Sequence, residues 1–103
     1  MKHELVYTPE AEEDVLEIVK KHAEWVGPNS ARNIYQGLRG GLLRLTEFPL
    51  KGQVHPDPEL AAKDFRKLVL DQTYVAVYRV LERSVVVYRV VNGARDYPAL
   101  LKG

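Results

Sequence analysis

The sequence predicts an α+β fold: a helical hairpin packed on an antiparallel β-sheet, in the order β-α-α-β-β-β with a C-terminal tail. Two stretches with apolar residues three or four apart fill residues 9 to 48, the spacing of amphipathic helices. Three runs rich in β-branched and aromatic residues follow, at Phe65–Leu70, Tyr74–Leu81 and Val85–Asn92. Because only three residues separate consecutive runs, the runs should form an antiparallel meander.

The composition is that of one globular domain spanning residues 1–103, with 46% hydrophobic and 28% charged residues. A net charge of +1 gives the whole chain no general attraction to polyanions, so any basic site must be local. The absence of cysteine excludes disulfides and thiolate ligands. No apolar run approaches the roughly 18 residues of a membrane span. We therefore expect a soluble, cytoplasmic protein that does not enter a membrane.

The first half of the chain carries clear start and stop signals. Residues Leu5–Tyr7 read as a short strand, and Thr8 and Pro9 suit the N-cap and first position of a helix. Gly27-Pro28 ends that helix, and Asn29 or Ser30 is expected to cap the next one.

Three glycines interrupt the second predicted helix, and a long loop follows it. Gly37, Gly40 and Gly41 weaken the second helix and indicate close packing or a kink. Residues Lys51–Lys63 read as a loop with a short helical turn over Glu59–Ala62, where we expect no chemistry.

Side-chain alternation makes both faces of the predicted sheet apolar. The helical hairpin covers one face, and two interpretations of the other remain open. Either a partner covers it, with a homodimer also compatible, or the C-terminal tail or sheet curvature hides it. The residues expected on the partner-facing side are Leu68, Leu70, Val75 and Val77.

Few residues suggest chemistry. His3, His22 and His55 lack metal-ligand spacing, and no serine lies in a glycine-framed elbow. The acidic cluster Glu10–Asp14 is explained by the helix dipole. We therefore expect no metal and no cofactor.

The arginines in and after the strands are more suggestive. Arg66, Arg79, Arg89 and Arg95 could converge at one edge of the sheet. Guanidinium groups bind phosphate or carboxylate in a bidentate manner. Alternatively, these arginines pair with neighbouring carboxylates and keep the sheet edges soluble.

Ordered motifs along nearly the whole chain resemble the RelE/ParE superfamily of toxins from type II toxin–antitoxin modules. This resemblance implies a helical hairpin on an antiparallel sheet, and a cognate antitoxin as partner. The motifs are Tyr7-Thr8-Pro9-Glu10-Ala11, Trp25-Val26-Gly27, Phe65-Arg66-Lys67-Leu68, Tyr74–Val80 and Val90–Asp96.

RelE-like members are ribosome-dependent mRNA endonucleases with basic residues and often a C-terminal tyrosine in the site. Aligned on the Tyr-x-x-x-Tyr of the second long strand, their arginine position falls on Val75, one lysine position on Leu68, and the tyrosine position near Leu101. Only Arg66 and Arg95 match basic positions. If the protein is a RelE-like mRNA endonuclease that acts with the ribosome, its catalytic residues must lie at other positions than in that pattern. The candidates are Arg66, Arg95 and Tyr97.

ParE-like members resemble this sequence more closely, with an apolar residue at the Val75 position and an ending like Gly93-Ala94-Arg95-Asp96. This resemblance implies a non-catalytic, plasmid-stabilising toxin that binds DNA gyrase and is neutralised by an antitoxin. A homologue without toxicity that only binds an antitoxin is a third interpretation. The residues expected to contact target or antitoxin are Arg66, Arg79, Arg95, Asp96 and Tyr97.

Overall fold

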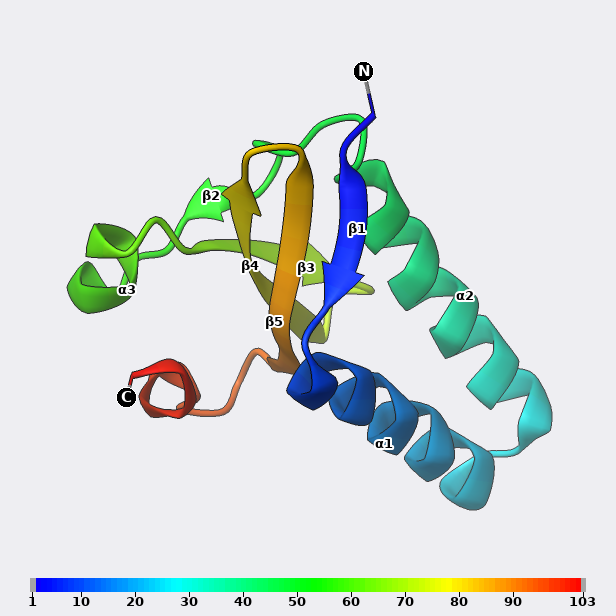
Figure 1. Cartoon of the computed structure of the whole chain (residues 1–103). Helices are drawn as coiled ribbons and strands as arrows, with labels where there is room; N and C mark the ends of the chain where they lie inside the picture. Colours follow the sequence, from blue (N-terminus) through cyan, green and yellow to red (C-terminus); the bar gives the residue numbers. More distant parts are fainter. Residues whose placement is uncertain (1, 103) are drawn as a thin grey trace.

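The computed structural model describes residues 2–102 and has the predicted order of elements with short additions (Figure 1). The elements are β1 (Glu4–Tyr7), α1 (Pro9–Trp25), α2 (Pro28–Arg44), β2 (Gln53–Val54), α3 (Pro58–Ala62), β3 (Arg66–Leu70), β4 (Tyr74–Leu81), β5 (Ser84–Asn92) and a 3₁₀ turn, η1 (Pro98–Leu101). The α3 helix confirms the expected helical turn. The β2 strand was not predicted, because two residues are too few to show a periodic pattern.

The five strands form one sheet in the order β1-β5-β4-β3-β2. Strands β3, β4 and β5 pair antiparallel as predicted, β2 adds antiparallel to β3, and β1 pairs parallel to β5. Short turns force the antiparallel pairs, but the two long helices between β1 and the meander permit a parallel pair. The sequence pattern does not show which edge β1 joins, so its parallel pairing with β5 was not predicted.

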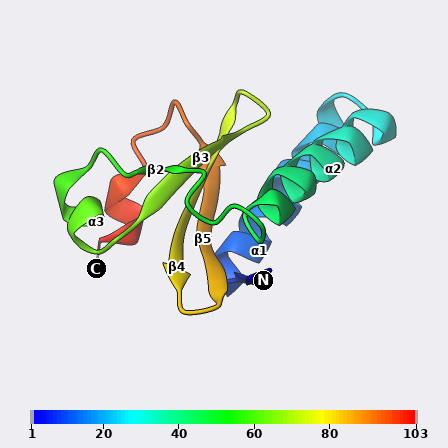
Figure 2. The same ribbon diagram turned by 90° about the horizontal axis from the view of Figure 1, so that it is seen from above.

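The two faces of the sheet carry different layers. Figure 2 shows the α1–α2 hairpin on one side of the strands, and α3 with the C-terminal turn on the other. The core under the hairpin is built from α1, α2 and alternate strand residues; its buried members include Ile18, Ile34, Leu38, Leu42, Leu45, Leu70, Ala76, Tyr78, Val85, Val87 and Val90. A second apolar cluster lies on the opposite face and comprises Leu60, Phe65, Val75, Val77, Val91 and Tyr97, with Tyr88 and Leu101 packed against it. We call this second cluster the distal cluster.

The helix starts differ in how they are capped. The Thr8 hydroxyl accepts a hydrogen bond from the Ala11 N–H at 3.1 Å, as predicted for an N-cap. The prediction of Asn29 or Ser30 as the second cap was wrong. Gly27 takes that position without a side-chain hydrogen bond, because its φ of 142° is accessible to glycine and Pro28 follows at the first helical position.

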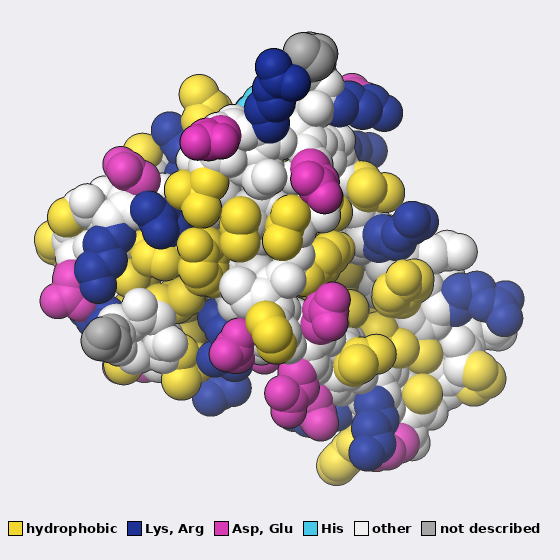
Figure 3. Space-filling view, in the orientation of Figure 1, with side chains coloured by type: hydrophobic (Ala, Val, Ile, Leu, Met, Phe, Trp, Pro, Cys, Tyr) yellow, Lys and Arg dark blue, Asp and Glu magenta, His cyan; other side chains and the backbone are white. Residues whose placement is uncertain are grey.

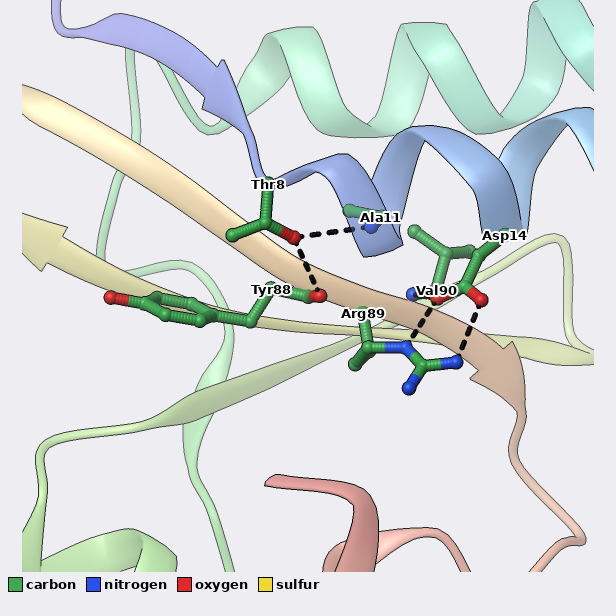
Figure 4. A network of polar contacts seen from close by, with 6 residues as sticks. All are labelled: Thr8, Ala11, Asp14, Tyr88, Arg89 and Val90. Atoms are coloured by element: carbon green, nitrogen blue, oxygen red, sulfur yellow. Dashed lines mark hydrogen bonds and ion pairs between the residues drawn. The ribbon is translucent and has the colours of Figure 1, made fainter. Parts of the chain in front are cut away.

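The beginning of α1 also completes the edge of β5, as Figure 4 shows. Pairing with β1 ends at Val87, and β5 bulges there, because Tyr78 pairs with Val87 while Val77 pairs with Arg89. Beyond this point the Thr8 hydroxyl donates to the Tyr88 carbonyl at 2.9 Å, and the Asp14 carboxylate accepts from the Val90 N–H at 2.9 Å. Side chains of the helix thus replace the missing strand.

The predicted partner-facing set is corrected by the strand register. Leu68 lies opposite Ala76, and Leu70 lies opposite Tyr74, so both leucines face the helical hairpin. Val75 and Val77 do lie on the other face, but the chain itself covers them in the distal cluster. Of the two interpretations of that face, the structure supports the one in which the C-terminal tail of the chain covers it.

Candidate functional site

The distal cluster occupies the place where the RelE-like pattern would carry an arginine. Val75 is 5% exposed and packs in one cluster with Leu60 from α3 and Tyr97 from the tail. Leu101 packs against the same cluster. This part of the sheet is therefore a filled apolar core rather than an open hollow.

A hydrogen bond between two buried side chains fixes the tail on this cluster. The Tyr97 hydroxyl lies 2.8 Å from Nε2 of His55, which is 3% exposed, and the two rings meet edge to face. Nδ1 of His55 accepts from the Asp57 N–H at 3.0 Å, so the neutral ring carries its proton on Nε2 and donates to Tyr97. Burial raises the pKa of Tyr97, and the nearby Asp57 carboxylate adds to the rise, so its hydroxyl stays protonated.

An ion pair at the surface adds a second attachment. The Lys102 Nζ lies 2.8 Å from the Asp57 carboxylate, and this bond lowers the pKa of Asp57. The same carboxylate caps α3 by accepting from the Glu59 and Leu60 N–H groups. Tail, α3 and the loop that precedes it are thus joined through His55 and Asp57.

Arg79 lies on the same face, nearer to the β4–β5 turn. Its guanidinium group packs over the Phe65 ring, 5.5 Å from the ring centroid, and one terminal nitrogen is 3.5 Å from the Tyr88 hydroxyl. Its Nε is buried and has no hydrogen-bond partner among the described residues. Figure 3 shows hydrophobic side chains gathered over the strands and on toward α3.

The other predicted contact residues lie elsewhere. Arg66 donates to the Gly52 carbonyl at 2.7 Å and holds the loop before β2. Arg95 and Asp96 are exposed in the turn after β5, at the end of the sheet opposite Arg79. Arg89 is paired with Asp14 on α1. The expected convergence of the arginines was therefore wrong. Arg66 lies opposite Tyr78, so Arg66 and Arg79 share one end of the sheet but lie on opposite faces, whereas Arg95 follows β5 at the other end.

His55 is the residue that sequence reasoning missed. It lies in the Pro-rich loop where no chemistry was expected, yet it is buried and links two separate segments. The available signal was a histidine directly before Pro56-Asp57-Pro58, a helix start, since a residue that precedes a cap can be held against the core. His22, by contrast, is hydrogen-bonded within the fold, with the Ser30 and Tyr74 hydroxyls 3.1 and 3.2 Å from its ring nitrogens.

Residues 2–102 contain no group of three or more His, Cys, Asp or Glu side chains placed to hold a metal ion. Within the same residues, none of the helices has the length and apolarity needed to cross a bilayer.

The His55 environment predicts a pH-dependent stability. Burial, followed by the charge of Lys67, lowers the pKa of His55 below its usual 6.5, while Asp57 opposes and Lys102 reinforces this shift. Below pH 6.5 the unfolded chain therefore binds a proton that the folded chain resists, so the free energy of unfolding should fall as the pH decreases through 6.5. Urea denaturation of wild type and His55→Gln from pH 8 to pH 5 checks this: the wild type should lose more stability than the variant, and parallel curves would contradict it.

The same fold occurs in solved structures of other proteins. The chain is similar to a structure described as the chromosomal ParDE system of P. aeruginosa (20% identity, TM-score 0.74, covering 88% of this chain and 96% of that one). It is also similar to the RelBE2 toxin–antitoxin complex of Mycobacterium tuberculosis (21%, 0.61, 89% and 99%) and to YafQ of E. coli (18%, 0.58, 99% and 100%). At these identities the similarity shows the fold alone. The sequence matches none of the curated proteins with which it was compared.

The family follows from the sequence itself. Residues 5–97 match the model of the ParE toxin of the type II toxin–antitoxin system parDE, which is most of the chain. The protein belongs to this family. The predicted resemblance to the RelE/ParE superfamily, nearer to the ParE-like branch, is confirmed, and the protein is a type II toxin by family.

Proposed function

We propose that this toxin acts by binding DNA gyrase, does not cut RNA, and is neutralised by a cognate antitoxin. The observation that supports this most strongly is the burial of Val75 in the distal cluster, where a ribonuclease of this fold would need cationic side chains. This function would place the protein in the cytoplasm.

Cleavage of RNA requires a proton acceptor, charge stabilisation at phosphorus and an acid for the leaving group within one site. The set considered for such an enzyme was Arg66, Arg95 and Tyr97. In the structure Arg66 binds the Gly52 carbonyl, Arg95 is exposed beyond the end of β5, and the buried Tyr97 hydroxyl is bonded to His55. These three groups do not face a common substrate position, which argues against this set.

Induced expression in a bacterial host tests the proposal in cells. Growth arrest with raised DNA damage and intact mRNA is expected, together with rescue by the antitoxin from the neighbouring open reading frame. Cleavage of mRNA during translation would overturn the proposal in favour of a RelE-like endonuclease, and absence of toxicity would favour the inactive homologue.

Among the proposed target contacts, Arg95 is the one whose replacement should lower toxicity without changing the stability of the fold. It is exposed and forms no side-chain bond among the described residues, so Arg95→Ala should change the free energy of unfolding by less than about 0.5 kcal/mol. Toxicity should nevertheless fall, because a free guanidinium group is available to a carboxylate or phosphate of the target. Plating efficiency under induction measures this against Arg83→Ala in the β4–β5 turn, and equal toxicity of the two variants at equal expression would remove Arg95 from the interface.

A further inference from the structure

Arg79 is a charged side chain to which the fold gives no acidic partner. It lies on the sheet face that carries the distal cluster, which we call the distal face, and its guanidinium carbon is 5.5 Å from the centroid of the Phe65 ring. Its Nε is buried without an acceptor, and it forms no ion pair with any carboxylate of residues 2–102. An apolar side chain would pack against Phe65 without the cost of a buried, unbonded N–H. The fold itself therefore does not require a guanidinium group at this position.

A β-bulge brings a tyrosine to the same place. Tyr88 is the extra residue of the bulge in β5, so it has no partner on β4. Its side chain extends away from α1 (Figure 4), and its ring meets Phe65 edge to face with the centroids 5.0 Å apart. Its hydroxyl lies 3.5 Å from Arg79 Nη1, which is the limit of a hydrogen bond, so this nitrogen can still donate to a stronger acceptor. Bulges are frequent beside functional sites, where they redirect a side chain.

An open apolar strip lies beside Arg79 on the distal face. Arg79 is opposite Val86 on β5, and Val86 is opposite Val6 on β1, so the three side chains form one row across the sheet. Leu81 follows two residues after Arg79 and points to the same face. Val6 and Leu81 are 36% and 39% exposed, whereas α3 and the C-terminal tail cover the distal cluster. This part of the face is therefore an exposed apolar surface with a cation inside it.

The charges around Arg79 argue against a nucleic acid as the ligand. Lys67 shares the distal face on β3 and Arg83 lies in the β4–β5 turn, but Glu4 shares the face on β1 and Glu82 lies in the same turn. These four charges cancel. Nucleic acids bind through several cationic contacts to their phosphates, whereas apolar residues around an arginine and a tyrosine are typical of the centre of a protein interface.

We propose that Arg79 binds a carboxylate of the target enzyme, from an aspartate or glutamate with apolar residues beside it. The guanidinium group would turn from the Phe65 ring and donate through Nε and one terminal nitrogen, so that the buried Nε gains an acceptor. Apolar residues of the target would pack on Val6, Leu81 and Val86 and exclude water from the ion pair. The proposal rests on the proposed function, because it takes DNA gyrase as the target.

Arg79→Met tests this contact, because methionine packs well on an aromatic ring but cannot bind an anion. The free variant should be at least as stable in urea as the wild type, since no ion pair is lost and a buried, unbonded N–H is removed. Its affinity for purified DNA gyrase without DNA should fall by about tenfold or more, which corresponds to 1.4 kcal/mol. The binding that remains should depend less on salt.

Two further variants define the role of the guanidinium group. Arg32→Met makes the same change at an exposed position of α2, on the other side of the sheet (Figure 2), and should bind gyrase as the wild type does. Arg79→Lys keeps the charge but loses the bidentate fork, so its affinity should lie between those of the wild type and Arg79→Met. Binding to plasmid DNA alone should be the same for all four proteins.

The outcomes separate this contact from the proposed function. If the wild-type toxin does not bind gyrase, the proposed function fails and the contact fails with it. If the wild type binds and Arg79→Met binds equally well, the contact is wrong while the pairing of toxin and gyrase stands. Two other results would also overturn the contact. Weaker binding of Arg79→Met to plasmid DNA alone would make the ligand a phosphate, and a loss of stability of this variant in urea would assign Arg79 to the fold.

Discussion

Replacing Asp14 with alanine should lower the free energy of unfolding by about 3 kcal/mol, because it leaves a poorly exposed charge without its partner. The Asp14 carboxylate accepts from Arg89 Nε at 2.7 Å, from Arg89 Nη2 at 2.8 Å and from the Val90 N–H at 2.9 Å (Figure 4). The side chains of Asp14 and Arg89 are only 14% and 23% exposed, and the bond to Asp14 raises the pKa of Arg89. Without the carboxylate, both the guanidinium group and a buried strand N–H lose their acceptor.

Urea denaturation of three variants separates these contributions. Asp14→Asn keeps an acceptor for Val90 but removes the charge, so a loss of about 1 to 2 kcal/mol is expected. Glu17→Ala removes an exposed carboxylate from the same helix and should stay within about 0.5 kcal/mol of the wild type. If the urea midpoint of Asp14→Ala equalled that of the wild type, α1 would not complete the edge of β5.

The second large effect is expected at Tyr78, which is fully buried. Its hydroxyl donates to the Pro49 carbonyl at 2.8 Å and accepts from the Gly52 N–H at 2.9 Å, and so fixes the loop between α2 and β2. Tyr78→Phe leaves both loop groups without this partner and should cost about 2 kcal/mol. Gly52 allows little adjustment, since even a Cβ would lie 2.6 Å from the Lys67 carbonyl oxygen.

The control for this variant is Tyr35→Phe, because the Tyr35 side chain is 45% exposed and its hydroxyl has no hydrogen bond among the described residues. Thermal unfolding of the two variants should differ clearly, with only Tyr78→Phe shifted downward. Equal melting temperatures would mean that the loop is held by other contacts.

Apart from the two-residue strand β2, the elements of the fold could be predicted because each has a local signal. Thr8 and Pro9 mark the start of α1, and the three-residue connections fix the β3–β4–β5 meander. What could not be predicted depends on register. Alternation gives two apolar faces in each strand, but only the pairing of Leu68 with Ala76 shows which side of β3 meets the helices.

The candidate site was less predictable for the same reason. The sequence analysis emphasised the arginines, but their convergence depends on the face and the end of the sheet that each one occupies. The structure separates Arg66 from Arg79 by face and Arg95 from both by its place after β5. Tyr97 was selected as a contact residue, yet its buried bond to His55 was hidden, because 41 residues lie between the two in the chain. Long-range pairs of this kind leave no periodic trace in a single sequence.

The most direct measurement of the central claim uses the purified toxin with DNA gyrase, a relaxed plasmid and ATP, and in parallel with ribosomes that are translating an mRNA. Our account predicts loss of supercoiling, accumulation of cleaved plasmid, and intact mRNA. Normal supercoiling together with mRNA cut on the ribosome would contradict it.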